Sequence, residues 1–294
     1  MLRNLDSKSE VGKRVDRLLL LADAYGRFPT PVEDIVAAAE LTMTGENPLD
    51  ESALKLMPKY LLAHLRAGLR KVEGALDRRA RLVHVRPDVA NQSRKRFILL
   101  HETTHAILPH QQDLVFADDH ETLAPTVKQV FEQEANQGAA ELLFQHRSFR
   151  DHAAQFEISM TSVQTLSHQY GASLHSTLRR FAETHRRAVA VAVFDPTPNP
   201  TTGMHWRRRE VVYSKNWEKR FGRPIWPTHM TGARHPFVAA LDQPGVDRAF
   251  MMDVALNEIS VRVEAVVTPY RAFVLLWVPA GALVMRPRRT VVLQ

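Results

Sequence analysis

Residues 97–108 read Phe-Ile-Leu-Leu-His-Glu-Thr-Thr-His-Ala-Ile-Leu, an apolar run with an H-E-x-x-H motif at its centre. Because four residues make just over one helical turn, a helix here stacks His101 and His105 on one face, close enough to share a metal ion. Glu102 lies on the flank of that face, where a carboxylate can accept a proton from water without occupying a ligand position. The motif therefore predicts a zinc hydrolase.

The residues around the motif favour a helix. Asn91 or Ser93 can cap its start, and Pro109 closes it. The alternative is an accidental pair of helical histidines, because the chain has 14 of them. Two polar rings on a largely apolar stripe would then each need a buried partner. We therefore favour the metal interpretation.

A zinc site needs a third protein ligand, and a catalytic site keeps a further position for water. Residues 125–144 predict a second helix, because apolar residues recur at helical spacing: Val127, Phe131, Ala135, Ala139 and Leu142. Glu132 and Asn136 lie along one edge of this stripe, so Glu132 can reach the metal and Asn136 can hydrogen-bond a ligating histidine. Glu134 is the alternative ligand, although it projects away from Asn136. For any of these carboxylates, a solvated helix face is the simpler interpretation.

These two segments together resemble the ImmA/IrrE family of metallopeptidases. In that family an H-E-x-x-H helix is followed by a helix carrying E-x-x-A-N and then F-A-A-x-L-L. The corresponding residues here are 96–105 and 131–143, and the resemblance extends over roughly residues 30–187. It implies zinc ligands and a catalytic base: His101, His105 and Glu132 as ligands, with Glu102 as the base.

The chain departs from the family pattern at two positions. Gly138 stands where the family usually has phenylalanine, and we expect looser packing there. Thr104 replaces the glycine commonly found before the second metal histidine. The resemblance also implies the substrate, a helix-turn-helix transcriptional repressor whose cleavage releases genes of a stress response or a mobile element. Zinc is the expected cofactor, although manganese or iron can occupy similar ligands.

Composition is consistent with a globular enzyme. The chain has 294 residues, of which 45% are hydrophobic and 24% charged, so it is long enough for two domains. The absence of cysteine excludes disulfides, thiolate ligands and cysteine nucleophiles. The first ten residues lack the apolar core of a signal peptide, and the apolar run at residues 18–21 is too short to span a bilayer. We expect a cytoplasmic protein with no membrane partner.

A β-hairpin is predicted over residues 72–86, just before the helix that carries the H-E-x-x-H motif (the metal helix). Its second arm alternates Leu82, His84 and Arg86 with Val83 and Val85. In many zinc peptidases an edge strand at this place pairs with extended substrate, and we expect the hairpin to provide it. The side chain of His84 either lines the cleft or is exposed. No group other than the metal is identified that could stabilise an oxyanion.

Residues 159–187 predict a helix-turn-helix shape. A helix ends near Tyr170, a turn follows at residues 171–172, Ser173 can cap the next helix, and apolar residues continue at helical spacing: Leu174, Leu178 and Phe181. A DNA-reading role would bring polar residues of this second helix to bases or phosphates: His175, Ser176, Arg179 or Arg180. The alternative is that two amphipathic helices simply complete the domain.

The positive net charge of the chain is compatible with DNA as a partner. The net charge is +7, and basic residues are dense at residues 179–187 and 207–209. An acidic partner such as DNA would suit this surface, but a basic surface can also be merely solubilising.

The last hundred residues predict a second, α+β domain. Residues 188–194 read as a strand and residues 195–203 as a loop, and the runs 259–267 and 272–278 form an antiparallel hairpin. All four tryptophans lie here and are interpreted as core residues: Trp206, Trp217, Trp226 and Trp277. Longer members of the family carry a sensor-like domain that resembles a GAF fold.

The predicted fold class is α+β: a mainly helical, zincin-like metallopeptidase domain with a small sheet, then the helix-turn-helix-like segment and the C-terminal domain. We place the boundaries at residues 1–150, 151–187 and 188–294. Two other functions remain open. The protein could be a DNA-binding regulator with a structural or vestigial metal site. It could also be the non-cleaving, partner-binding half of a two-gene module.

Overall fold

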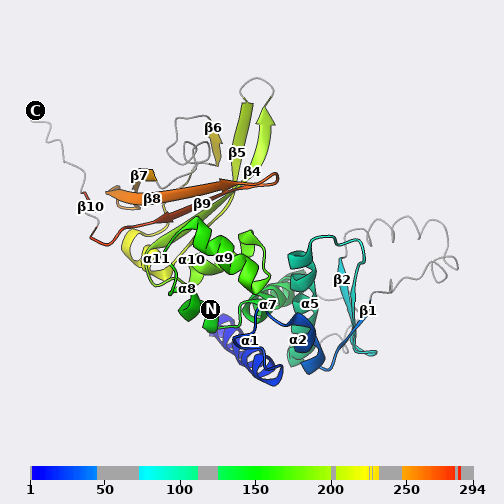
Figure 1. The fold of residues 1–294 in the computed structure, drawn as a ribbon. Coiled ribbons are helices and arrows are strands. Elements are labelled where there is room, and N and C mark those ends of the chain that lie inside the picture. The colour runs from blue at the N-terminus through cyan, green and yellow to red at the C-terminus, as the bar shows by residue number, and fades with distance from the viewer. Residues whose placement is uncertain are drawn as a thin grey trace, which may run out of the picture. The chain divides into compact units, whose positions relative to one another are not determined.

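The structure is a computed structural model that describes residues 2–44, 73–111, 125–199, 203–224, 226, 228–231, 247–281 and 284–285. The chain divides into two compact units. The first comprises Met1–Phe149 and His168–Ser173, and the second comprises Arg150–Ser167 and Leu174–Gln294. Helices dominate the first unit and an antiparallel sheet dominates the second (Figure 1), which confirms a mixed α+β fold.

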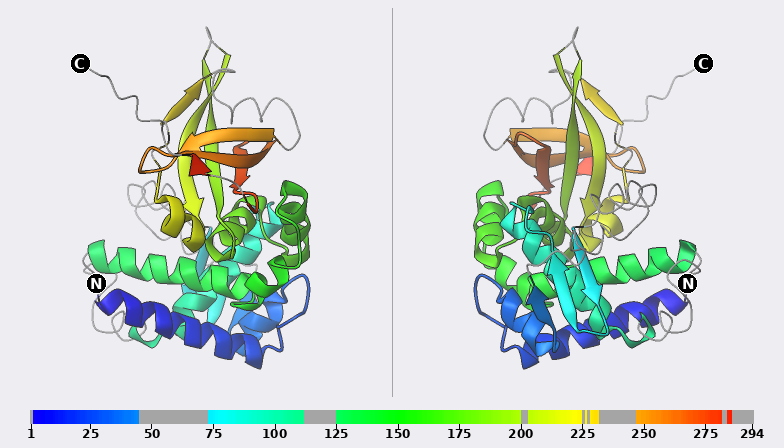
Figure 2. Two further views of the ribbon diagram at one scale, coloured as in Figure 1. Left: turned by 90° about the vertical axis from the view of Figure 1, so that its left-hand side faces the viewer. Right: turned by 90° about the vertical axis from the view of Figure 1, so that its right-hand side faces the viewer.

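Four helices build the described part of the first unit: α1 (Leu2–Leu21), α2 (Val32–Ala38), α5 (Gln92–Ile107) and α7 (Pro125–Leu143). Helix α1 buries an apolar stripe, in which Val15 and Leu19 are fully inaccessible. Helix α7 packs against both α1 and α5, and Figure 2 shows α1 and α7 side by side. Among the helices in the described ranges, none is both long and apolar enough to cross a membrane.

Helix α5 begins and ends where its capping residues require. The Asn91 side chain accepts a hydrogen bond from the Arg94 backbone N–H at 3.0 Å, and the Ser93 hydroxyl donates to Asn91 at 2.8 Å. Asn91 is therefore the cap, with Ser93 supporting it. At the other end Leu108 is extended (φ −93°, ψ 106°), because the following Pro109 disfavours helical geometry in the residue before it.

A three-stranded sheet accompanies these helices: β1 (Thr42–Thr44), β2 (Gly74–Asp77) and β3 (Leu82–Val85), in the order β1-β3-β2. The predicted hairpin is confirmed, because β2 and β3 are antiparallel. However, β3 is the central strand, since β1 pairs with its other side in parallel. The second arm of the hairpin therefore does not form the sheet edge, which among the described strands falls to β1 and β2. His84, on β3, is half-buried.

Helices α5 and α7 approach closely at Gly138. A Cβ atom added to Gly138 would lie 2.3 Å from Cγ2 of Thr104, which is closer than two side chains can come. The expectation of looser packing at Gly138 is therefore wrong. Thr104 fills the space opposite it, so the two departures from the family pattern form one contact.

Three helices follow: α8 (Ser148–Ala153), α9 (Met160–Tyr170) and α10 (Leu174–Thr184). Helices α9 and α10 lie where the sequence predicts them. The chain passes between the two units within α8, within α9 and again just before α10. Gly171 in the turn has a φ of +66°, a conformation that glycine adopts without strain, and an added Cβ would lie 2.9 Å from the Arg96 guanidinium. A helix-turn-helix function for these helices remains a prediction.

The second unit contains a sheet of seven strands within the described ranges: β4 (Val189–Asn199), β5 (Gly203–Tyr213), β6 (His229–Thr231), β7 (Asp247–Met252), β8 (Glu258–Val267), β9 (Ala272–Trp277) and β10 (Val284–Met285). The order is β10-β8-β9-β4-β5-β6, with β7 also paired to β8, and all neighbours are antiparallel. The predicted hairpin of β8 and β9 is confirmed, and its turn is closed by a 2.8 Å bond from Thr268 N–H to the Arg271 carbonyl.

The loop predicted at residues 195–203 is wrong for most of its length. Residues 195–199 continue β4, and Gly203 begins β5. Strand β4 pairs with β9 only as far as Phe194 and beyond it pairs with β5 alone. Proline has no backbone N–H to donate to a neighbouring strand. Pro196 and Pro198 are tolerated in this part of β4 because the side that faced β9 no longer needs such donors.

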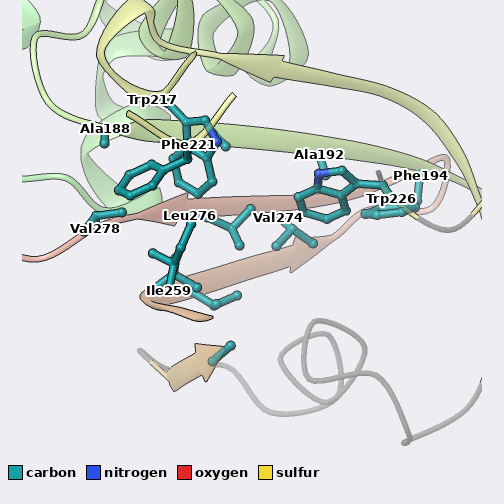
Figure 3. Packing of buried hydrophobic residues seen from close by; sticks show 14 of the residues in the cluster. Ala188, Ala192, Phe194, Trp217, Phe221, Trp226, Ile259, Val274, Leu276 and Val278 are labelled. Atoms are coloured by element: carbon teal, nitrogen blue, oxygen red, sulfur yellow. The ribbon is translucent and has the colours of Figure 1, made fainter. Parts of the chain in front are cut away.

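The core of the second unit is rich in tryptophan, as predicted. Trp206, Trp217, Trp226 and Trp277 are at most 9% exposed. In Figure 3, Trp217 and Phe221 of α11 (Lys215–Phe221) lie over the sheet near Leu276 and Val278, while Trp226 lies near Phe194. The sheet and its helices give an α+β unit, while the GAF-like assignment stays a prediction.

Candidate metal centre

Three side chains that could hold a metal ion converge where α5 meets α7. His101 and His105 stand one turn apart on α5, and their Nε2 atoms are 3.1 Å apart. Glu132 reaches them from α7, with its carboxylate oxygens 3.3 Å from Nε2 of His101 and 3.8 Å from Nε2 of His105. One donor atom from each residue lies within 4.8 Å of the others. Within the described ranges, no other group of three such residues is brought together.

This donor set fits zinc. Two imidazole nitrogens and a carboxylate oxygen are common zinc ligands, and in a tetrahedral site with bonds of about 2 Å the donors lie roughly 3.3 Å apart. The spacings of 3.1, 3.3 and 3.8 Å are close to that value. The imidazoles are largely buried, at 16% and 12% exposure, whereas the Glu132 side chain is 49% exposed.

Burial and neighbouring charges shift the pKa values of the side chains in the site in opposite directions. Burial lowers the pKa of His101, but its hydrogen bond to Glu132 and the charges of Glu102 and Glu132 outweigh burial, so the pKa is raised. Burial lowers the pKa of His105 despite its bond to Gln111. The bond from His101 also holds the pKa of Glu132 below its ordinary value. The electrostatics thus favour an anionic Glu132 and a neutral His105.

Glu102 lies beside the group on α5, facing strand β2. Burial raises its pKa, although the charges of His101 and Arg78 act in the opposite direction. Gly74 of β2 passes close to it, because an added Cβ would lie 3.3 Å from the Glu102 carboxylate and 2.3 Å from Cγ2 of Ile98. A carboxylate with a raised pKa, next to two imidazoles, has the properties of a general base.

The other predicted residues of α7 take different positions. The side chain of Asn136 interacts with His101 and contributes to the raised pKa of that histidine. Glu134, the alternative ligand, is 7% exposed and belongs to a neighbouring cluster. Its carboxylate lies 2.6 Å from Nε2 of His110 and accepts a hydrogen bond from Gln111 at 2.8 Å. Glu134 is therefore not on a solvated helix face.

Two residues near the site were not identified from the sequence pattern. Gln111 is fully buried, and its side-chain oxygen lies 2.6 Å from Nδ1 of His105. Arg78, between β2 and β3, donates to the Gln111 backbone carbonyl at 2.6 Å, and its charge acts on both Glu102 and His105. The only local signal for Gln111 is a polar residue directly after the end of the metal helix. Arg78 carries no signal, because two further arginines are close to it in sequence.

The two arginines considered for DNA are on α10, in the second unit, whereas the group of possible metal ligands belongs to the first unit. Arg179 is exposed but pairs with Glu183 at 3.0 Å and with Glu210 at 3.1 Å. Arg180 is half-buried. His175, on the same helix, also hydrogen-bonds Glu210. Much of the charge that DNA would need from Arg179 is thus engaged within the protein.

The comparison with protein families decides the kind of domain. Residues 61–182 match the family model of the IrrE N-terminal-like domain, a peptidase family. The chain contains an IrrE N-terminal-like domain. This match confirms the resemblance to the ImmA/IrrE family, whose members are metallopeptidases. The IrrE-like match includes α5 and α7, and therefore all three converging side chains.

A solved structure has a similar fold. It is described as a Mycobacterium tuberculosis transcriptional regulator and aligns with a TM-score of 0.51 over 92% of this chain and 76% of its own, at 11% sequence identity. At this identity the likeness concerns the fold alone. No curated protein matches the chain. The IrrE-like domain is therefore the main functional evidence beyond the site itself.

Proposed function

We propose that the protein is a zinc-dependent endopeptidase. His101, His105 and Glu132 would hold the metal, and Glu102 would act as the base. The single observation that carries the proposal is the convergence of three donor atoms within 4.8 Å, with the buried Glu102 next to them. The match to the IrrE-like peptidase family supports it. Manganese or iron would suit similar ligands, so zinc is the first metal to test.

The side chains around the site have distinct tasks in this proposal. A divalent metal bound there would supply Lewis-acid catalysis and lower the pKa of nearby water. Glu102 accepts the proton of the attacking water and delivers it to the leaving amine. Burial assists this role, because it brings the pKa of Glu102 closer to neutral pH. Asn136 orients His101 through its side-chain interaction, and Arg78 limits the rise in the Glu102 pKa.

The proposed substrate is a helix-turn-helix transcriptional repressor, cut so that the genes it controls are released. Family membership is the support for this choice, and the similar fold of a protein described as a transcriptional regulator agrees with a regulatory setting. Strand β2 gives a means of binding, because it is an edge among the described strands and Gly74 brings it next to Glu102. An extended peptide could add to that edge. The proposed substrate implies a cytoplasmic location.

The test uses repressors encoded beside the gene as substrates and mass spectrometry to find fragments. Glu102→Gln should bind as much zinc as the wild type but cleave at least about 100-fold more slowly, because general acid–base catalysis contributes about 10²–10⁴-fold. Glu141→Gln is the matched control, since Glu141 lies on α7 and bonds His146 at 2.8 Å, away from the metal residues. Cleavage by Glu102→Gln at the normal rate would show that the assigned base is wrong. Binding of a repressor without fragments would favour the non-cleaving module.

A DNA-binding regulator remains the second candidate. It is favoured by the net charge of +7 and by the helices α9 and α10 joined through a tight turn. Promoter DNA binding whose salt dependence weakens in Arg179→Ala and Arg180→Ala would support it. Equal binding by wild type and both variants would remove these arginines from the interface.

A further inference from the structure

We infer that Gln111 is a positioning residue that fixes the tautomer of His105 and so presents its Nε2 atom to the metal. This inference rests on the proposed function of the site. It starts from a chain of hydrogen bonds that runs from His105 through Gln111 to Glu134 and on to His110. Gln111 itself is fully buried, so its amide must find all of its partners within the protein.

The orientation of the Gln111 amide follows from its neighbours. Its nitrogen lies 3.5 Å from the backbone carbonyl of Phe131 and 2.8 Å from the carboxylate of Glu134. A backbone carbonyl can only accept hydrogen bonds, so the NH₂ group must be at this end of the amide. Each of its two N–H groups then has an acceptor. The oxygen is consequently at the other end, 2.6 Å from Nδ1 of His105.

The orientation of Gln111 determines the protonation of His105. Because an amide oxygen only accepts, Nδ1 of His105 must carry the proton. In a neutral imidazole the lone pair is then on Nε2. This is the nitrogen that lies 3.1 Å from Nε2 of His101 and 3.8 Å from the Glu132 carboxylate.

Glu134 and Arg78 hold Gln111 in place. Glu134 is 7% exposed, and its carboxylate accepts the hydrogen bond from the Gln111 amide nitrogen. Arg78 donates to the backbone carbonyl of Gln111 at 2.6 Å. Gln111 therefore connects the β2–β3 turn, the metal helix α5 and helix α7. Partners that orient a ligating histidine typically contribute 10–100-fold to metal affinity, and Gln111 has this position.

The test measures zinc affinity by competition with a chelator, on the full chain. Gln111→Met keeps the volume but neither donates nor accepts strongly, so the dissociation constant should rise about 10–100-fold. Gln145→Met is the matched control. Gln145 is equally buried in the same unit, and its amide bonds Gly26 and Arg27 at 2.8 Å rather than a proposed metal ligand. It should lose stability but keep the wild-type zinc affinity.

A double variant tests the direction of the hydrogen bonds. Gln111→Glu alone places two carboxylates 2.8 Å apart and should weaken zinc binding. Adding Glu134→Gln exchanges the amide and the carboxylate between positions 111 and 134. The new carboxylate at position 111 then accepts from His105, and the new amide at position 134 donates to that carboxylate. Zinc affinity should return to within about 10-fold of the wild type. A merely structural role for Gln111 predicts no such rescue.

A second readout separates this inference from the proposed function. In ¹⁵N NMR spectra of the metal-free, histidine-labelled chain, His105 should be protonated at Nδ1 in the wild type and a mixture of tautomers in Gln111→Met. This holds whether or not the wild type binds zinc, and a wild type without zinc affinity would overturn only the proposed metal site. Unchanged zinc affinity in Gln111→Met would overturn the inference, as would His105 protonated at Nε2 in the wild type.

Discussion

Thr104 of α5 and Gly138 of α7 share one contact, in which a Cβ on the glycine would lie 2.3 Å from the threonine Cγ2. The threonine is one position before His105, and the glycine is six positions after Glu132. The close approach of the two backbones therefore sets the distance between the histidines of one helix and the glutamate of the other. A small residue is needed on one of the two helices, and here it is on α7.

Gly138→Ala should destabilise the protein. Overpacking a tight contact costs about 1–3 kcal/mol, which outweighs the gain of up to about 1 kcal/mol from replacing a helical glycine. Denaturant unfolding followed by circular dichroism would measure the loss. Gly12→Ala in α1 is the control, because its Cβ would find the nearest atom at an ordinary 3.5 Å and should stabilise the helix. Adding Thr104→Ala should recover part of the loss at Gly138, and a fully stable Gly138→Ala would contradict the contact.

The two glutamates of α7 should differ in their effect on zinc binding. Glu132→Ala removes a proposed ligand and should weaken binding by more than about 100-fold. Glu134→Ala acts only through Gln111 and should weaken it by about 10–100-fold. Calorimetric titration of zinc into each variant measures both values. A larger loss for Glu134→Ala would show that the third ligand had been assigned to the wrong carboxylate.

Gly74→Ala should slow cleavage more than it weakens zinc binding. The added Cβ would clash with Ile98 at 2.3 Å and approach the Glu102 carboxylate at 3.3 Å, so the base would shift. A displacement of the Glu102 carboxylate by up to about 1 Å should reduce the rate of cleavage about 10–100-fold. Ile98→Ala in the same chain removes the clashing methyl group and should restore part of the rate. Equal rates for Gly74→Ala and wild type would mean that β2 does not constrain Glu102.

The stability of the second unit should depend on pH through Glu210. The hydrogen bond from His175 and the nearby charges of Arg179 and Arg209 hold the pKa of Glu210 below its ordinary value, despite burial. A lowered folded-state pKa stabilises the fold above the unfolded-state pKa of about 4.3, and this contribution is lost as the pH falls through the folded-state value. Glu210→Gln should therefore be less stable than wild type at pH 7, and the difference should shrink toward pH 3.

Tryptophan fluorescence measures this effect selectively, because all four tryptophans lie in the second unit. Glu183→Gln is the control, since Glu183 forms an exposed i,i+4 pair with Arg179 and its replacement should change stability by about 0.5 kcal/mol or less. A constant difference between wild type and Glu210→Gln from pH 7 to pH 3 would contradict the assigned role of the carboxylate.

Local features of the fold were predictable from the sequence. The cap at Asn91, the end of α5 before Pro109 and the buried stripe of α1 each depend on residues within a few turns of one another. The spacing of His101, Glu102 and His105 depends only on helical geometry. Such features need no knowledge of distant segments, and the structure agrees with them.

Features that depend on distant segments were not predictable. The central position of β3 requires β1, which precedes it by about forty residues, and the extension of β4 through Pro196 requires a partner strand with an open opposite side. Gln111 and Arg78 become significant only when the β2–β3 turn, α5 and α7 meet. The tight fit of Gly138 likewise depends on its neighbour across the helix interface. In each case the deciding partner lies outside the range of a sequence pattern.

Zinc-edge X-ray absorption of the loaded protein tests whether His101, His105 and Glu132 together hold one zinc ion. We expect one zinc per chain with two imidazoles and oxygen donors at about 2.0–2.2 Å, and the loss of one imidazole in either histidine-to-alanine variant. A spectrum without imidazole scattering, or one left unchanged by both His101→Ala and His105→Ala, would contradict it.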